Sequence, residues 1–301
     1  MTGNEIVKNE FNGNELSLLS LVPQVLRARD FRLYTDGGKR LVDLWLNGGS
    51  AVLGHTPPSL LREIKNTASR GLYAPFPHFT RQRFLKALSQ LLPGMVYRIF
   101  AAPPNELCLP NDKMSPNAKP VLWRPFLDFC LPPSAQKSAP EKQPTASVQQ
   151  NSPVIPVLPG IQGWRNGLPV GLCVCAAPSA CEDTAFSKLP AGDFLPPVLL
   201  AAAARGIWDL IAANPQRANI QWQHINKIIK TSPWKRRGIY LFPQNKPSPE
   251  TWALLFRNFL DAGFLLPPVP DHPLILPGIL SPGEEAKLAE VLSQAFPDIP
   301  G

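Results

Sequence analysis

Residues Phe31–Lys65 read FRLYTDGGKRLVDLWLNGGSAVLGHTPPSLLREIK, and they contain the most distinctive local pattern in the chain. Two short apolar segments, 31–35 and 40–45, flank Asp36-Gly37-Gly38. Glycines supply the positive φ angles of a tight turn, so this pattern predicts a β-hairpin. Thr56-Pro57-Pro58 then predicts the start of a helix, because proline is favoured in the first helical turn.

Further helices are indicated by apolar spacing and by their end signals. A stripe of apolar residues over 84–92 predicts a helix that stops at Pro93-Gly94, and Pro197–Ala213 predicts a helix covered on most sides. Ser248-Pro249 opens another helix. Ser281, Pro282 and Glu284 form a capping box that predicts the start of the last one.

Composition excludes a largely disordered chain and gives no sign of a membrane span. Apolar residues make up 44% of the 301 residues and charged residues 17%. No run of 18 or more apolar residues occurs, and residues 1–15 lack the basic and apolar pattern of a signal peptide. We therefore expect a soluble, cytoplasmic protein. The 37 prolines limit long helices.

The five cysteines do not suggest disulfides or a metal site. An odd count in a long chain suits a reducing compartment. Cys173 and Cys175 lie in the apolar run GLCVCAA, without a second pair or a nearby histidine. We predict two buried strand thiols and no bound metal.

Basic residues are concentrated in one stretch of a chain whose formal net charge is +8. Residues 210–249 hold seven Lys and Arg residues and no acid, with Trp222 and Trp234 between them. Such clustering suits phosphate groups and stacked bases, but no recognition motif accompanies it. We predict a solvated basic face beside a strand in preference to a nucleic-acid site, and we expect no membrane contact.

The middle of the chain differs in composition from the parts on either side. Lys137–Asn151 has one valine and no aromatic residue, which predicts a flexible loop. The apolar runs Val154–Leu158 and Leu168–Ala177 after it predict buried strands.

Three separated segments resemble the class III aminotransferases, the pyridoxal-phosphate family that includes glutamate-1-semialdehyde aminomutase. Phe31–Lys65 is similar to the opening of that family, with its Asp-Gly hairpin, glycine-containing loop and Leu-Gly-His turn. Gly160–Cys175 resembles the loop and Gly-Leu-Pro-Val-Gly strand that follow the Schiff-base lysine. Trp252–Ala295 resembles the C-terminal domain.

The resemblance implies an α/β protein of the fold-type-I pyridoxal-phosphate transferase class, in a contracted form. We expect a mostly parallel central sheet with helices on both faces and a C-terminal α/β domain. The expected divisions are an arm with a short helix over 1–30, a hairpin segment with a contracted cofactor-type domain over 31–215, and a small domain over 216–301.

The same resemblance places the expected site residues. Counted back from Leu168, the Schiff-base lysine position is Gln162, and counted back from Pro197, the phosphate-binding threonine position is Gly192. A substrate-side aromatic expected near Gly48 is missing. Asp128 is the candidate partner of the pyridinium nitrogen, and Lys188 is the candidate for a relocated lysine. His55 has the loop-ordering role of the Leu-Gly-His turn.

Two functional hypotheses follow from that comparison. The first is a degenerate aminotransferase-fold protein with a structural, regulatory or binding role, because an amide at position 162 cannot form the Schiff base with pyridoxal phosphate. The second is an active aminotransferase or aminomutase with a relocated lysine, acting on a small-molecule amine or amino acid. In both cases the resemblance implies a homodimer.

Overall fold

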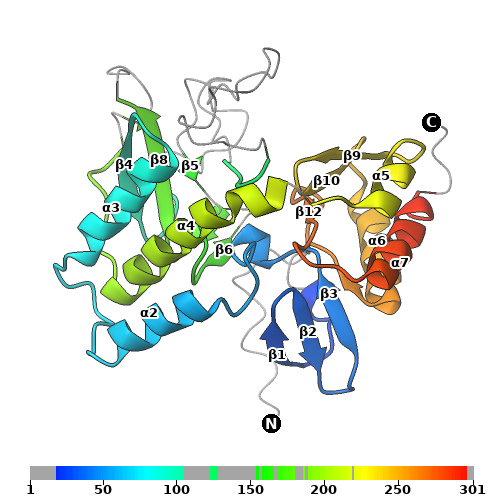
Figure 1. Cartoon of the computed structure of the whole chain (residues 1–301), viewed down its shortest axis with the longest axis horizontal. Coiled ribbons are helices and arrows are strands. Elements are labelled where there is room, and N and C mark those ends of the chain that lie inside the picture. Colours follow the sequence, from blue (N-terminus) through cyan, green and yellow to red (C-terminus); the bar gives the residue numbers. More distant parts are fainter. Residues whose placement is uncertain are drawn as a thin grey trace, which may run out of the picture. The chain divides into compact units, whose positions relative to one another are not determined.

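The computed structural model describes residues 18–104, 123–127, 154–155, 158–165, 168–179, 186, 189–218 and 220–296. Two compact units are present (Figure 1). The first unit comprises Met1–Gly48, Arg165–Gly167 and Ile220–Gly301, and the second comprises Gly49–Trp164 and Leu168–Asn219.

The first unit contains a four-stranded sheet that joins distant parts of the chain. Its strand order is β1 (Val25–Arg29), β2 (Arg32–Thr35), β3 (Arg40–Asp43) and β11 (Phe264–Leu265). The β2–β3 hairpin is confirmed, with Gly38 at φ 74°. Strand β11 runs parallel to β3 and pairs Phe264 with Val42.

This pairing divides the chain differently from the sequence-based expectation. Residues 31–48 belong to the same unit as the C-terminal part, because β3 shares its sheet with β11. The expected domain over 31–215 had grouped these residues with the residues of the second unit. Within the expected N-terminal arm, Val25–Arg29 form strand β1, because they pair with β2. The expected flexible loop at 137–151 lies outside the described residues.

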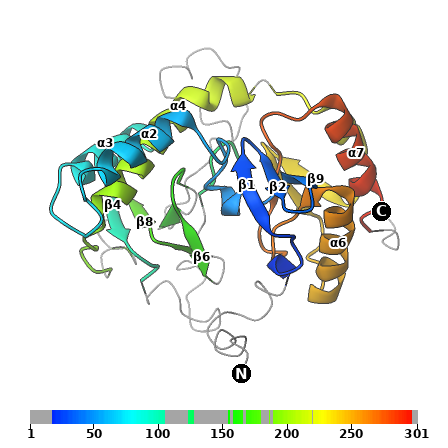
Figure 2. The same ribbon diagram turned by 90° about the horizontal axis from the view of Figure 1, so that it is seen from below.

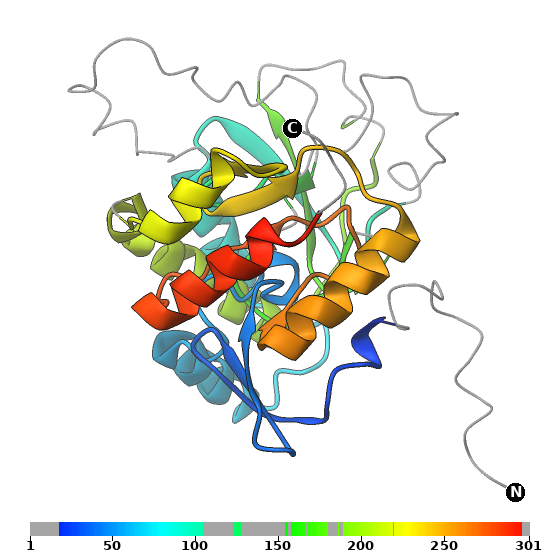
Figure 3. The ribbon, with the colours of Figure 1, turned by 90° about the vertical axis from the view of Figure 1, so that its right-hand side faces the viewer.

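A second sheet and three helices complete the first unit. The sheet has the order β12 (Leu274–Ile275), β10 (Tyr240–Pro243) and β9 (Trp234–Arg237). The helices are α5 (Gln223–Ile229), α6 (Pro249–Ala262) and α7 (Pro282–Ser293). Figure 3 shows α7 between α5 and α6.

The predicted starts of α6 and α7 are confirmed. Ser248 accepts a hydrogen bond from the backbone of Thr251, and Gly263 ends α6 at φ 93°. Ser281 and Glu284 form the expected capping box at the start of α7. The buried face of α6 includes Trp252 and Phe256, as the apolar spacing requires.

The second unit contains three helices and a small sheet. The helices are α2 (Pro58–Ala68), α3 (Thr80–Leu91) and α4 (Pro197–Ala218), preceded by the short turn η1 (Asn47–Gly49) at the junction of the units. The sheet has the order β4 (Met95–Phe100), β8 (Cys173–Pro178) and β5 (Val154–Ile155). Strands β6 (Gly163–Arg165) and β7 (Leu168–Val170) form a separate pair.

The described strands of the second unit do not form the expected mostly parallel sheet. Strand β8 is antiparallel to both β4 and β5. Parallel neighbours need a long crossover, usually a helix. The connection from β5 to β8 instead carries the β6–β7 strand pair, so β8 returns in the opposite direction.

The two faces of this sheet are covered differently. Ile99, Val174 and Ala176 pack with residues of α3 and α4, and Figure 2 shows these helices on one side of β4 and β8. On the other face, Cys173 and Cys175 pack with Phe186 and Leu189, which lie outside any helix. Helices on both faces are therefore absent from the part of the chain that the structure describes.

Cys173 and Cys175 are buried, free thiols, as predicted. They lie two residues apart on β8 and so share the face that packs against Phe186. The hydrogen bond to Cys175 and burial raise the pKa of the Cys173 thiol. A thiol held in its neutral form is a poor nucleophile and metal ligand, so this pair has a packing role.

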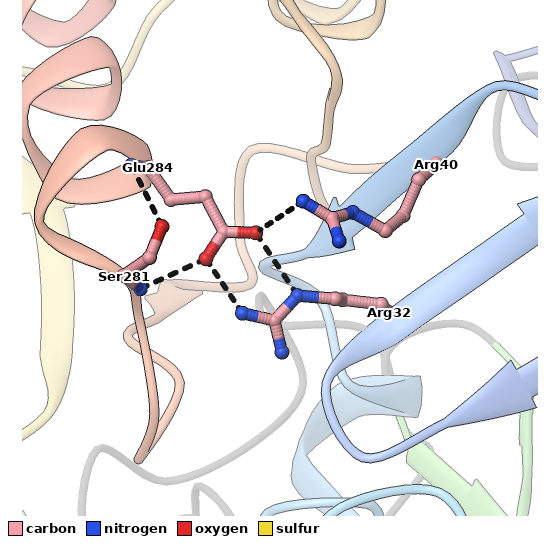
Figure 4. Close-up of polar contacts among 4 residues, drawn as sticks. All are labelled: Arg32, Arg40, Ser281 and Glu284. Carbon is pink, nitrogen blue, oxygen red and sulfur yellow. Dashed lines mark hydrogen bonds and ion pairs between the residues drawn. The ribbon is translucent and has the colours of Figure 1, made fainter.

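One ion-pair cluster ties the last helix of the first unit to its hairpin (Figure 4). The Glu284 carboxylate accepts from Arg32 Nε at 2.9 Å and from the Ser281 backbone at 2.9 Å, and it pairs with Arg40 at 3.2 Å. Burial alone would raise the pKa of Glu284. The Arg32 and Ser281 hydrogen bonds outweigh burial and lower this pKa to about 2.

We predict that Glu284→Gln lowers the free energy of unfolding at pH 7 by about 2 kcal/mol, because it leaves the Arg32 guanidinium without its charged partner. The depressed pKa adds stability that is fully present above pH about 4.5 and is lost as the pH falls towards 2. The free energy of unfolding, measured with urea, should therefore fall less between pH 7 and pH 3 for the variant than for the natural protein. Glu290→Gln, at an exposed position of α7, is the matched control. Identical pH profiles for the two variants would contradict this role of Glu284.

Candidate functional site

Gln162, at the expected lysine position, is a buried residue directly before β6. Only 7% of its surface is exposed, and its Nε2 donates to the Leu172 carbonyl oxygen at 2.6 Å. Leu172 directly precedes β8. The Gln162 side chain therefore joins two backbone segments inside the second unit, and its amide has a structural partner.

The loop that leads to Gln162 lies directly on α4. A Cβ atom at Gly206 of α4 would fall 2.4 Å from the Pro159 oxygen, and one at Gly160 would meet the Ala203 backbone at 3.6 Å. Only small residues allow this approach. Ala203 and Gly206, three residues apart on α4, are thus small where the loop lies against the helix.

Gly192, at the expected phosphate-binding position, is pressed against strand β4. Its φ is +103°, and a Cβ atom there would fall 2.7 Å from the Ile99 oxygen and 3.2 Å from the Ile99 nitrogen. The next residue continues the contact, because Asp193 N donates to Ile99 O at 2.7 Å and the Asp193 carboxylate accepts from Ala101 N at 2.8 Å. Backbone atoms of β4 occupy the space that a side chain at position 192 would need.

The glycine-containing turn after β3 has an unusual backbone. Leu46, Asn47, Gly48 and Gly49 all have positive φ, at 49°, 49°, 65° and 103°. The Asp43 carboxylate supports the turn by accepting from Trp45 N and Leu46 N, both at 2.8 Å. The missing aromatic at Gly48 thus falls at a left-handed position, which favours glycine.

The structure does not test the other two cofactor candidates. Asp128 and Lys188 lie outside the described residues. His55 is half-buried in the link between η1 and α2. Among the residues that the structure describes, no group of His, Cys, Asp and Glu side chains could hold a metal ion, and no helix is long and apolar enough to span a membrane.

The two tryptophans of the basic stretch at 210–249 are buried. Trp222 and Trp234 are 3% and 1% exposed, and Trp234 Nε1 donates to the Leu292 carbonyl oxygen at 3.2 Å. Both rings are therefore unavailable for stacking on bases. Sequence analysis missed three exposed rings in the link between α2 and α3, at positions 73, 76 and 79, because composition does not distinguish an exposed ring from a buried one.

No protein-family model matches the chain. A Treponema pallidum (strain Nichols) protein described as uncharacterized is 26% identical over 304 residues, covering 84% of this chain and 89% of that protein. An uncharacterized Borreliella burgdorferi protein is 44% identical over 71 residues, which is 24% of this chain and 26% of that protein.

Solved structures resemble the chain over most of its length. An ornithine aminotransferase from Plasmodium yoelii has a TM-score of 0.54 at 14% identity, covering 91% of this chain and 93% of that one. A glutamate-1-semialdehyde aminomutase from Pseudomonas aeruginosa in complex with PMP has a TM-score of 0.57 at 14% identity, covering 91% and 87%. The chain has an aminotransferase-like fold. At this level of identity the likeness extends to the fold alone.

We predict that Gly192→Ala destabilises the protein more than Gly171→Ala does. Both glycines have positive φ, at 103° and 91°, so both variants should lose about 1 kcal/mol to backbone strain. Nothing lies within 4 Å of a Cβ at Gly171, whereas a Cβ at Gly192 meets Ile99 O at 2.7 Å. The overlap should cost about 2 kcal/mol more. Urea unfolding of both variants measures the difference, and equal losses would show that the space beside Gly192 opens freely.

Proposed function

We propose that this chain is an aminotransferase-fold protein that does not carry out pyridoxal-phosphate chemistry and has a structural, regulatory or binding role. The observation that carries the proposal is the contact of Gly192 with Ile99, which leaves no space for the hydroxyl-bearing side chain expected there. The position itself is assigned by its distance from Pro197 in the sequence.

Gln162 supports the proposal independently. Covalent attachment of pyridoxal phosphate needs a primary amine, and the same amine moves the substrate proton. An amide does neither. Here the Gln162 amide is buried and donates a hydrogen bond to Leu172 O, so the residue has a structural role instead of a catalytic one.

The residues at positions 162 and 192 do not fit pyridoxal phosphate. Position 162 offers no amine and position 192 offers no hydroxyl, while the backbone around both is closely packed. No catalytic step through pyridoxal phosphate is therefore derived for this chain.

We predict that neither the natural protein nor Gln162→Lys binds pyridoxal phosphate tightly. A lysine at position 162 would lack the phosphate contact, and its ammonium group would enter a buried site. The test adds micromolar pyridoxal phosphate, records the visible absorption of the lysine-bound cofactor, and maps any adduct by mass spectrometry after borohydride reduction. We expect no single dominant adduct.

Lys188→Ala is the control for that experiment. A saturating adduct on Lys188 of the natural protein, lost in this variant, would overturn the proposal and establish the relocated lysine. The alternative enzyme would then be tested with small amines and amino acids as amino donors. A saturating adduct on the lysine of Gln162→Lys would show that the cofactor site is intact apart from one residue.

The homodimer implied by the resemblance stays a prediction. Helix α4 has a hydrophobic sequence, but Leu200, Ala203 and Ile207 are already buried within the chain, and Trp208 is 37% exposed. The cytoplasmic location is likewise a proposal. Light scattering at micromolar concentration should give about twice 33.0 kDa for a dimer. A single species at the monomer mass would contradict it.

A further inference from the structure

The first turn of α3 is held by a histidine side chain. The Thr80 backbone N–H donates to His78 Nδ1 at 3.3 Å, and Thr80 Oγ1 lies 3.1 Å from the same nitrogen. Because a backbone N–H is always a donor, Nδ1 supplies the lone pair, and the ring proton of the neutral imidazole is on Nε2. His78 thus caps the helix in the way that an Asn or Ser side chain commonly does.

Burial makes this cap hard to replace. Thr80 is only 2% exposed, so water has little access to its N–H. Among the described residues, Thr80 N has no other acceptor. A proton on Nδ1 would let the ring donate to Thr80 Oγ1, but it would leave the Thr80 N–H facing another donor. A buried N–H without an acceptor destabilises the segment that contains it.

The charges around this turn do not compensate for a proton on His78. Two cations follow on the same helix, Arg81 and Arg83, and a positive charge at a helix N-terminus is unfavourable. The neighbouring elements contribute Glu63 of α2, Asp193 before α4, and Arg205 with Asp209 on α4. Glu63 is already paired with Arg83 at 3.0 Å, and Asp209 with Arg205. The Asp193 carboxylate accepts from the backbone after β4 at 2.8 Å. Within the described ranges, no acid forms an ion pair with the His78 ring.

The same turn carries a contact that reaches the segment before α4. Arg81 Nη1 donates to the Asp193 carbonyl oxygen at 2.9 Å. Asp193 N in turn donates to Ile99 O at 2.7 Å, beside the place where Gly192 lies against β4. Arg81 directly follows Thr80, so its position depends on the turn that His78 caps. The charge of His78 is therefore linked to the contacts of residues 192–193.

We propose that His78 is a pH-sensitive cap of α3. Its neutral imidazole closes the first turn, and a proton on Nδ1 opens that turn and loosens the contact of Arg81 with Asp193. Histidine is the side chain suited to such a switch, because imidazole changes charge between pH 5 and pH 8. The Glu284 carboxylate cannot respond there, since its pKa is about 2. The proposal rests on hydrogen bonds within the second unit, goes beyond the proposed function and does not depend on it.

The first measurement uses the natural chain. Long-range proton–nitrogen NMR of the His78 imidazole at pH 7.5 should show a proton on Nε2 and none on Nδ1. On titration to pH 5.0, the ring signals of His78 and the amide signals of Thr80 and Arg81 should shift with one midpoint, because one proton causes both changes. A proton on Nδ1 at pH 7.5, or a Thr80 amide that does not follow the ring, would overturn the proposal.

Hydrogen exchange with mass spectrometry measures the opening of the turn. His78→Asn is the matched variant, because an Asn side chain caps a helix N-terminus without changing charge over this pH range. At pH 7.5, residues 80–83 should be equally protected in the two proteins. At pH 5.0 they should be about tenfold less protected in the natural protein, since its buried Thr80 N–H has lost its acceptor. Comparing the two proteins at one pH removes the effect of pH on exchange itself.

Two further variants separate His78 from other groups. His224→Asn, at an exposed position of α5, should keep the loss of protection at pH 5.0. Arg81→Gln should keep that loss at residues 80–83 and remove the pH dependence at Asp193, because the link between the turn and that residue is gone. Equal protection of the natural protein and His78→Asn at pH 5.0 would contradict the proposal, as would a loss at residues 80–83 with none at Asp193 in the natural protein.

Discussion

The close approach of helix α4 and the loop around Pro159 is the constraint on which the second unit depends. Gly206 permits it, since any side chain there would collide with the Pro159 carbonyl. Because the loop lies so near the helix, Gln162 is carried to the start of β6 with its side chain buried. The small residues of α4 therefore determine how the chain passes the position where the resemblance expects a catalytic lysine.

A second close approach of the backbone occurs just before α4. In the segment that precedes this helix, Gly192 lies against the Ile99 backbone of β4, and Asp193 N donates to Ile99 O. Arg81 at the start of α3 donates to the Asp193 carbonyl oxygen at 2.9 Å and strengthens this contact. Gly192 is thus held against the backbone of Ile99 and Gln162 is held by its hydrogen bond to Leu172 O, and these two contacts support the proposed absence of cofactor chemistry.

Local features could be predicted from the sequence, and long-range pairings could not. The hairpin at Asp36-Gly37-Gly38 and the capping box at Ser281 rest on interactions between near neighbours, and both are present. The direction of β8 depends on which strands flank it, and nothing in the run CVCAAP encodes that choice. In the site, Gln162 and Gly192 could be located by resemblance to a family, but the collision at Gly192 is visible only when Ile99 is placed beside it. The basic stretch was predicted to be a solvated face in preference to a nucleic-acid site, but the burial of Trp222 and Trp234 could not be predicted, because composition does not distinguish a buried ring from an exposed one.

The parallel pairing of β3 with β11 has a consequence for how the protein is made. Strands β1 to β3 leave the ribosome early, but the edge of β3 stays open until Phe264 and Leu265 have been synthesised. During that interval the second unit, which lies between these segments in the sequence, can fold first. The N-terminal strands therefore pass through a period with an unpaired edge, when they are most exposed to aggregation and most dependent on chaperones.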